Sequence, residues 1–162
     1  MGWSSFASVG YDGRLVTVEV DIRRGIPGMD IVGLPGSAVR EARERVRIAV
    51  RNSGFEFPRD RILVNLSPAD LPKSGCAYDL PIALAVLEAA GQVPSDGNDR
   101  FAVGELLLSG DVRSVQGIIS AASAGLAAGI GDFIVPRQNL REARALEAGT
   151  VFGVGSLREA VH

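Results

Sequence analysis

Cysteine and histidine are almost absent from this sequence, which contains one of each, Cys76 and His162. A single cysteine cannot form a disulfide within the chain, and this pair provides too few ligands for a Cys/His zinc site. The same scarcity argues against the Cys–His and Ser–His–Asp arrangements of common hydrolases. So low a cysteine content is typical of the reducing cytoplasm, which is where we expect the protein.

Long apolar runs are also missing. The least polar stretch, residues 115–135, is rich in Ala, Gly and Ser and is interrupted by polar residues such as Gln116 and Asp132. This composition predicts a buried helix and strand and not a membrane span. The first ten residues have neither the basic nor the apolar region of a secretory signal. We therefore expect a cytoplasmic protein without membrane contact.

No excess of one charge dominates the chain, because 17 basic and 19 acidic residues leave a net charge of -2. A chain this close to neutral has no global field that attracts nucleic acid, so any basic site must be local. The length of 162 residues is that of one domain, which buries roughly two thirds of its unfolded surface. With no Pro/Ser/Gly-rich linker and no internal repeat, we expect a single domain over residues 1–162.

The hydrophobic pattern predicts the elements of this domain. Alternating apolar residues over 3–9, 15–22 and 29–32 predict an antiparallel β-meander. Apolar residues at spacings of 3, 4 and 3 predict a helix over 36–52 that ends at Ser53-Gly54. Further predicted elements are a strand at 61–66, a helix at 79–90, a hairpin or bent strand over 101–108 and 111–115, a helix at 117–129, a strand at 133–135, a helix at 139–148, a strand at 151–154 and a turn at 157–161. This order predicts an α/β (α+β) fold, a mixed sheet packed with helices.

Charge is distributed unevenly along the chain. Residues 13–61 hold ten arginines against seven acids, whereas residues 62–162 hold seven basic and eleven acidic residues. Within the first predicted helix, Arg40, Arg43, Arg47 and Arg51 recur at spacings of 3, 4 and 4, which places them along one face. This arginine ridge is either a solvated surface or a surface that contacts phosphates or a neighbouring subunit. Two further arginines that could join it are Arg23 and Arg24.

The only lysine, Lys73, lies in a loop between a predicted strand and a predicted helix. The loop is a candidate site, but it is not a phosphate-binding P-loop, because Leu71 and Pro72 stand where that motif requires glycine. Cys76 has no histidine to act as its base and is interpreted as an inert thiol. Asp79 is interpreted as the cap of the following helix, with Pro81 in its first turn. No residue pattern predicts a metal site.

Four segments together resemble a known family: the stretch 9–58, SPADLPKSGCAYDLPIALAVLEAAGQVP at 67–94, VGELLLSGDVRSVQGIISAASAGLAAG at 103–129 and FIVPRQNLREA at 133–143. They are similar to the N-terminal domain of the magnesium-chelatase-like bacterial proteins of the ComM/YifB family. The resemblance implies the fold of the Lon protease domain, which a ribosomal protein domain and GHMP kinases share. It also implies an AAA+ ATPase module beyond residue 162, where ATP and magnesium would bind.

The resemblance to Lon proteases permits a residue-by-residue comparison. Lon-type enzymes use a serine in a loop of the form PKDGPSAG and a lysine in GELxxxGxVxxxGGLKEK. In this sequence Ala77 falls at the serine position and Ile119 at the lysine position. Alanine has no nucleophilic atom and isoleucine cannot accept a proton, so we expect no peptidase activity from this chain.

Three functional hypotheses follow from the residues and the resemblance. The first is a non-catalytic domain that helps to assemble a hexameric AAA+ ATPase and DNA helicase, with the arginine ridge on single-stranded or branched DNA during branch migration in natural transformation. The second is a pure interaction domain, which contacts its own AAA+ module or neighbouring subunits through the ridge or the small-residue helix at 117–129. The third, least favoured, is a residual hydrolase at the Lys73 loop.

Overall fold

The computed structural model describes residues 2–9, 12–68, 77–94, 97–116, 128–144 and 150–161. Within these residues a seven-stranded sheet has the strand order β3-β4-β2-β1-β5-β8-β9, and β6 and β7 form a separate pair. The strands are β1 (Gly2–Val9), β2 (Asp12–Arg23), β3 (Gly28–Val32), β4 (Arg61–Ser67), β5 (Asp99–Ala102), β6 (Glu105–Leu106), β7 (Val112–Arg113), β8 (Asp132–Pro136) and β9 (Thr150–Val154).

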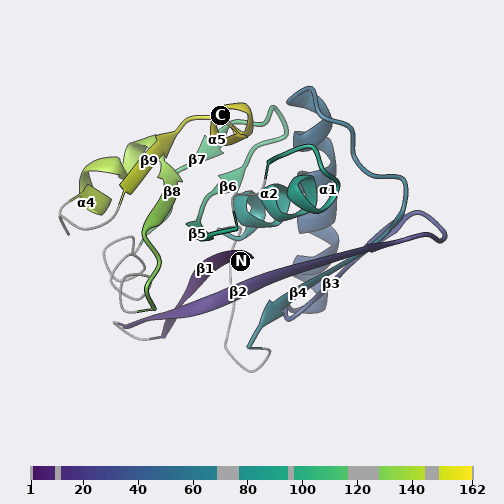
Figure 1. Cartoon of the computed structure of the whole chain (residues 1–162), viewed down its shortest axis with the longest axis horizontal. Helices are drawn as coiled ribbons and strands as arrows, with labels where there is room; N and C mark the ends of the chain where they lie inside the picture. Colours follow the sequence, from purple (N-terminus) through teal and green to yellow (C-terminus); the bar gives the residue numbers. More distant parts are fainter. Residues whose placement is uncertain are drawn as a thin grey trace.

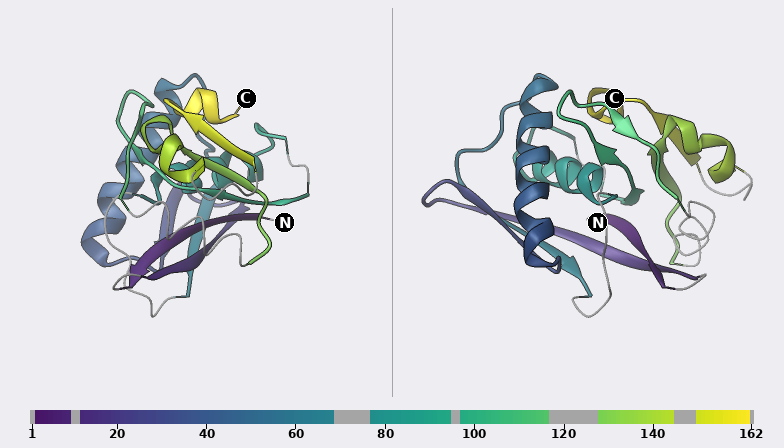
Figure 2. Two further views of the ribbon diagram at one scale, coloured as in Figure 1. Left: turned by 90° about the vertical axis from the view of Figure 1, so that its left-hand side faces the viewer. Right: turned by 180° about the vertical axis from the view of Figure 1, so that it is seen from behind.

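Helices pack against this sheet, as Figures 1 and 2 show. They are α1 (Gly36–Asn52), α2 (Asp79–Ala89), the 3-10 turn η1 (Arg137–Asn139), α4 (Leu140–Arg144) and α5 (Leu157–Val161). α1 and α2 lie beside each other and contact the strands from β1 to β3, whereas α4 lies against β8 and β9. The mixed α/β architecture confirms the predicted fold class.

The predicted β-meander is correct for its first two strands and wrong for the third. β1 and β2 pair in antiparallel fashion, but β3 does not pair with β2, because β4 lies between them. β4 is antiparallel to β2 and parallel to β3. β3 and β4 can pair in parallel because α1 connects them and carries the chain back to the edge of the sheet where β3 begins. Alternation of apolar residues identifies the buried face of a strand but does not identify its partner.

The core forms where apolar rows of the sheet meet α1 and α2. One row crosses three strands through Ile31, Val64 and Val20, and the next through Met29, Ile62 and Ile22. Residues 80–87 of α2 are all buried, so this helix is apolar around its whole circumference and has no solvated face. A second cluster contains Phe6, Phe101 and Phe133. The ring centroids of Phe6 and Phe101 are 6.4 Å apart, and those of Phe101 and Phe133 are 5.4 Å apart.

The remaining predictions have mixed outcomes. The predicted hairpin is present in shorter form, as the antiparallel pair β6 and β7. The helix predicted over 139–148 is observed as α4, after which residues 145–149 lie outside the described part of the chain. The predicted helix at 117–129 also lies outside it, except for its last two residues. Among the described residues, no helix is both long and apolar enough to cross a membrane.

Candidate functional site

The arginine ridge stands on α1, whose bounds agree with the sequence prediction. The helix forms because Ala42, Val46, Ala49 and Val50 bury one stripe against the core. Its C-terminus closes in a Schellman motif, in which Gly54 has a φ of +89°. The Gly54 amide donates to the Arg51 carbonyl at 3.1 Å, and the Phe55 amide donates to the Val50 carbonyl at 3.2 Å. The chain that leaves α1 therefore has a fixed direction.

A groove of about 440 Å³ runs beside the ridge. Its walls are α1, the segment just after the turn between β2 and β3, and the segment that follows α1. Figure 2 shows that this turn extends past α1 on the side to which the chain leaves the helix. The residues that give the groove its character are Arg43, Arg47, Arg51, Arg59, Glu44 and Phe57. Because its lining has four guanidinium groups and one carboxylate, we call this space the arginine groove. It is a local basic site on a nearly neutral chain.

The arginines of the ridge differ in how far they are already engaged. Arg43 is half-buried, and its Nη1 donates to the Met29 carbonyl at 3.3 Å, which supports β3. Arg47 pairs with Glu44 at 2.7 Å on the exposed surface. Such an exposed pair contributes about 0–1 kcal/mol, so it is easily exchanged for a phosphate contact. Arg51 is exposed, and its side chain has no hydrogen-bond or ion-pair partner within the described part of the chain.

One arginine of the ridge, Arg40, and the two that could join it, Arg23 and Arg24, do not line the groove. Arg40 lies one turn before Arg43 and is exposed, but it does not line the groove. Arg23 ends β2 and pairs with Asp21 at 2.6 Å, and Arg24 is exposed in the turn that follows. Arg59 does line the groove and was missed by the sequence reasoning, because it comes from the irregular segment after α1 and shares no helical spacing with the others.

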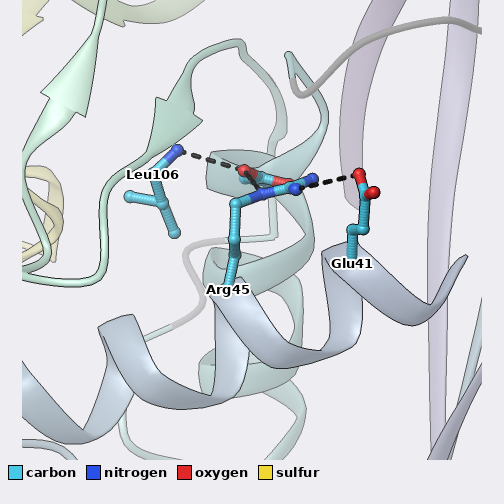
Figure 3. A network of polar contacts seen from close by, with 4 residues as sticks. Glu41, Arg45 and Leu106 are labelled. Carbon is cyan, nitrogen blue, oxygen red and sulfur yellow. Dashed lines mark hydrogen bonds and ion pairs between the residues drawn. The ribbon is translucent and has the colours of Figure 1, made fainter. Parts of the chain in front are cut away.

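Arg45, an arginine of α1 outside the ridge, turns into the protein. Its Nε donates to Oδ2 of Asp79 at 2.8 Å and its Nη2 to Oδ1 at 3.2 Å. The same carboxylate accepts the Leu106 amide at 3.2 Å, so Asp79 joins α1, α2 and β6 (Figure 3). Glu41 approaches Arg45 at 3.8 Å from one turn earlier in α1. The interpretation of Asp79 as a helix cap is therefore wrong: Tyr78 is the N-cap residue, and Asp79 is the first residue within the helix.

Burial dominates the ionisation of Asp79, whose side chain is 2% exposed. Loss of hydration raises the pKa of its carboxyl group to about 6, although hydrogen bonds and the charge of Arg45 act in the opposite direction. Sequence reasoning missed this ion pair, because the spacing of Arg45 places it beside the buried stripe of α1 but does not identify Asp79 as its partner.

Of the two positions that align with the catalytic serine and lysine of Lon proteases, the structure describes only the first. Ala77 is half-buried, packs against the aromatic cluster of Phe6, Phe101 and Phe133, and accepts the Gly104 amide through its carbonyl at 2.9 Å. Lys73 and Ile119 lie outside the described residues, so the candidate role of the Lys73 loop stays a prediction. Among the described residues, no three His, Cys, Asp or Glu side chains gather in a way that could hold a metal ion.

Comparison with known proteins identifies the family. The model of the family of subunit ChlI of Mg-chelatase matches residues 18–139. Uncharacterized protein YifB of Escherichia coli is 45% identical over 152 residues, which are 93% of this chain and 29% of YifB. Competence protein ComM of Haemophilus influenzae is 41% identical over 158 residues, which are 97% of this chain and 31% of ComM.

A more distant similarity links the chain to Lon protease of Geobacter metallireducens, which is 26% identical over 137 residues, or 80% of this chain and 16% of the protease. The chain thus spans less than a third of the length of the curated relatives YifB and ComM. Since the family model matches most of the chain, the protein belongs to the family of subunit ChlI of Mg-chelatase, in agreement with its resemblance to magnesium-chelatase-like proteins.

Proposed function

We propose that this chain is a non-catalytic accessory domain of a Mg-chelatase-like AAA+ ATPase and that its arginine groove binds the phosphates of nucleic acid. The observation that carries the proposal is the gathering of four arginines from two segments in one groove. Guanidinium groups form strong, directional hydrogen bonds with phosphate oxygens, and a local cluster of them is the electrostatic footprint of a nucleic-acid site. Membership of the family supports the ATPase part, and the name of the competence protein ComM is consistent with work on DNA.

The absence of catalysis is part of the proposal. At the position of the Lon nucleophile this chain has Ala77, whose methyl group packs into an apolar cluster. The sequence contains no G-x-x-x-x-G-K-[ST] motif, so the proposal assigns the binding of ATP and magnesium to an AAA+ module outside this chain. Assembly into a hexamer and branch migration of DNA are proposed for the full-length protein on the same family grounds.

The test measures binding of the chain to fluorescently labelled oligo(dT) by anisotropy at several salt concentrations. If the four arginines each neutralise one phosphate, the logarithm of the affinity falls with the logarithm of salt at a slope of about -3, from about -0.7 per contact on single strands. Arg47→Glu combined with Arg51→Glu should reduce the slope to about -1.4 and weaken binding at least about tenfold. Arg43 is left intact, because its bond to Met29 supports β3.

A matched control changes the net charge equally at another surface. Arg141 and Arg144 are both exposed on α4 and do not line the groove. Arg141→Glu combined with Arg144→Glu should leave the salt slope unchanged. Equal losses in the two double variants would show a non-specific charge effect and contradict the proposal, as would the absence of binding at low salt.

A further inference from the structure

The arginine groove shares one wall with a second, larger hollow of about 1180 Å³. Arg51, Phe57 and Arg59 line both spaces, and Phe55 lines only the larger one. Phe57 is half-buried: it packs against the hydrophobic core and also lines the wall that the two spaces share. An apolar ring in this place contributes nothing to phosphate binding. It does offer a flat surface next to groups that hold a nucleic-acid backbone.

The chain is held at the two residues that precede Phe57. The Schellman motif of α1 sets the direction of the chain at Phe55. At Glu56, Gln92 forms a reciprocal pair of bonds: the Glu56 amide donates to Gln92 Oε1 at 3.1 Å, and Gln92 Nε2 donates to the Glu56 carbonyl at 2.6 Å.

Gln92 is itself held by the C-terminus of α2, where its amide donates to the Leu87 carbonyl at 2.9 Å and Gly91 has a φ of +78°. This is a second Schellman motif. The ends of α1 and α2 therefore hold Phe55 and Glu56, and Phe57 packs against the core. Phe57 is thus presented without a large loss of conformational freedom on binding.

Extending the proposed function, on which it rests, we infer that the arginine groove takes single-stranded nucleic acid and that an unpaired base stacks on Phe57. Arginines alone would suit duplex and single strand equally, because both expose phosphates. In a duplex the faces of the bases are covered by their neighbours, whereas an unpaired base can leave the stack and lie on an aromatic ring. A cationic groove with an aromatic platform is the combination that single-strand binding proteins use without sequence preference.

The experiment separates the base from the phosphate by comparing labelled oligo(dT) with an abasic strand of the same length and charge. The chain should bind oligo(dT) about tenfold more tightly than the abasic strand, which corresponds to one stacked base. Phe57→Leu should abolish this preference and leave the salt slope unchanged. Phe55→Leu, the matched control, should keep the preference, because Phe55 does not line the groove.

A further variant tests the positioning role of Gln92 and does not depend on Phe57 replacement. Gln92→Ala should lower the preference for oligo(dT) over the abasic strand while the salt slope stays the same. Equal binding of the two strands by the wild-type chain overturns the inference and leaves the proposed function intact. Binding of a duplex as tight as that of oligo(dT) also overturns it, whereas binding of neither strand contradicts the proposed function itself.

Discussion

Arg45→Met is expected to lower the free energy of unfolding by about 3–5 kcal/mol near pH 8, where Asp79 is ionised in the folded chain. The reason is that the substitution leaves a carboxylate that is 2% exposed without its cationic partner. The Leu106 amide then remains as its one hydrogen-bond donor in the described part of the chain. Denaturant unfolding followed by circular dichroism measures the loss.

Two comparisons make this result specific to the buried pair. Arg47→Met removes an exposed pair on the same helix and should cost no more than about 1 kcal/mol. Adding Asp79→Asn to Arg45→Met should recover part of the loss near pH 8, because the amide keeps an acceptor for Leu106 and removes the unpaired charge. Equal costs for Arg45→Met and Arg47→Met would contradict the assignment of a buried ion pair between α1 and α2.

The second large effect is a dependence of stability on pH. In the folded chain burial raises the pKa of Asp79 to about 6, whereas its ordinary value is 3.8. Between these values the folded state holds a proton that the unfolded state has lost, so Asp79 stabilises the fold at low pH and this stability is lost as the pH rises to about 6. Two pH units correspond to about 3 kcal/mol, an upper limit for this one group.

The contribution of Asp79 is isolated by subtracting the stability of Asp79→Asn at each pH. The difference between wild type and variant should fall as the pH is raised from about 4 to about 6 and stay constant above that range. The subtraction also cancels the contributions of groups whose pKa shifts in the opposite direction. One of these is Glu159 on the surface, whose pKa is lowered by the Gly155 amide and by Arg137. A difference that grows with pH would mean that attraction to Arg45 outweighs burial and would contradict the assigned direction.

Sequence reasoning succeeds here where one local pattern determines the structure. Helix α1 follows from its apolar stripe and from Gly54, because helical periodicity and the Schellman glycine both act within a few residues. The ridge is real as a face of α1, yet only its last three members reach the groove. The opposite wall comes from residues 27–29, whose position depends on the pairing of β3 with β4 and not on anything local.

Apart from Arg59, the missed features involve residues that are distant in the sequence. Arg45 and Asp79 are 34 residues apart, and Asp79 already had an adequate local explanation as a helix cap. Gln92 and Glu56 are 36 residues apart, in segments with no pattern in common. The third strand was misplaced for the same reason, since partner choice depends on the crossover through α1. Periodicity assigns a side chain to a face, but packing decides which other residue it meets.

The most direct test of the central claim, that nucleic acid lies in the arginine groove, is photochemical cross-linking of the chain to single-stranded DNA that carries 4-thiothymidine, with the cross-linked peptides mapped by mass spectrometry. Cleavage at arginine isolates residues 52–59 as one tryptic peptide that contains Phe57. The account predicts that this peptide carries the major cross-link in the wild-type chain. Arg47→Glu with Arg51→Glu should remove the cross-link from the longer peptide 46–59, which the variant releases because it lacks the cleavage sites at 47 and 51. Cross-links confined to α4, α5 or another surface away from the groove would contradict the account.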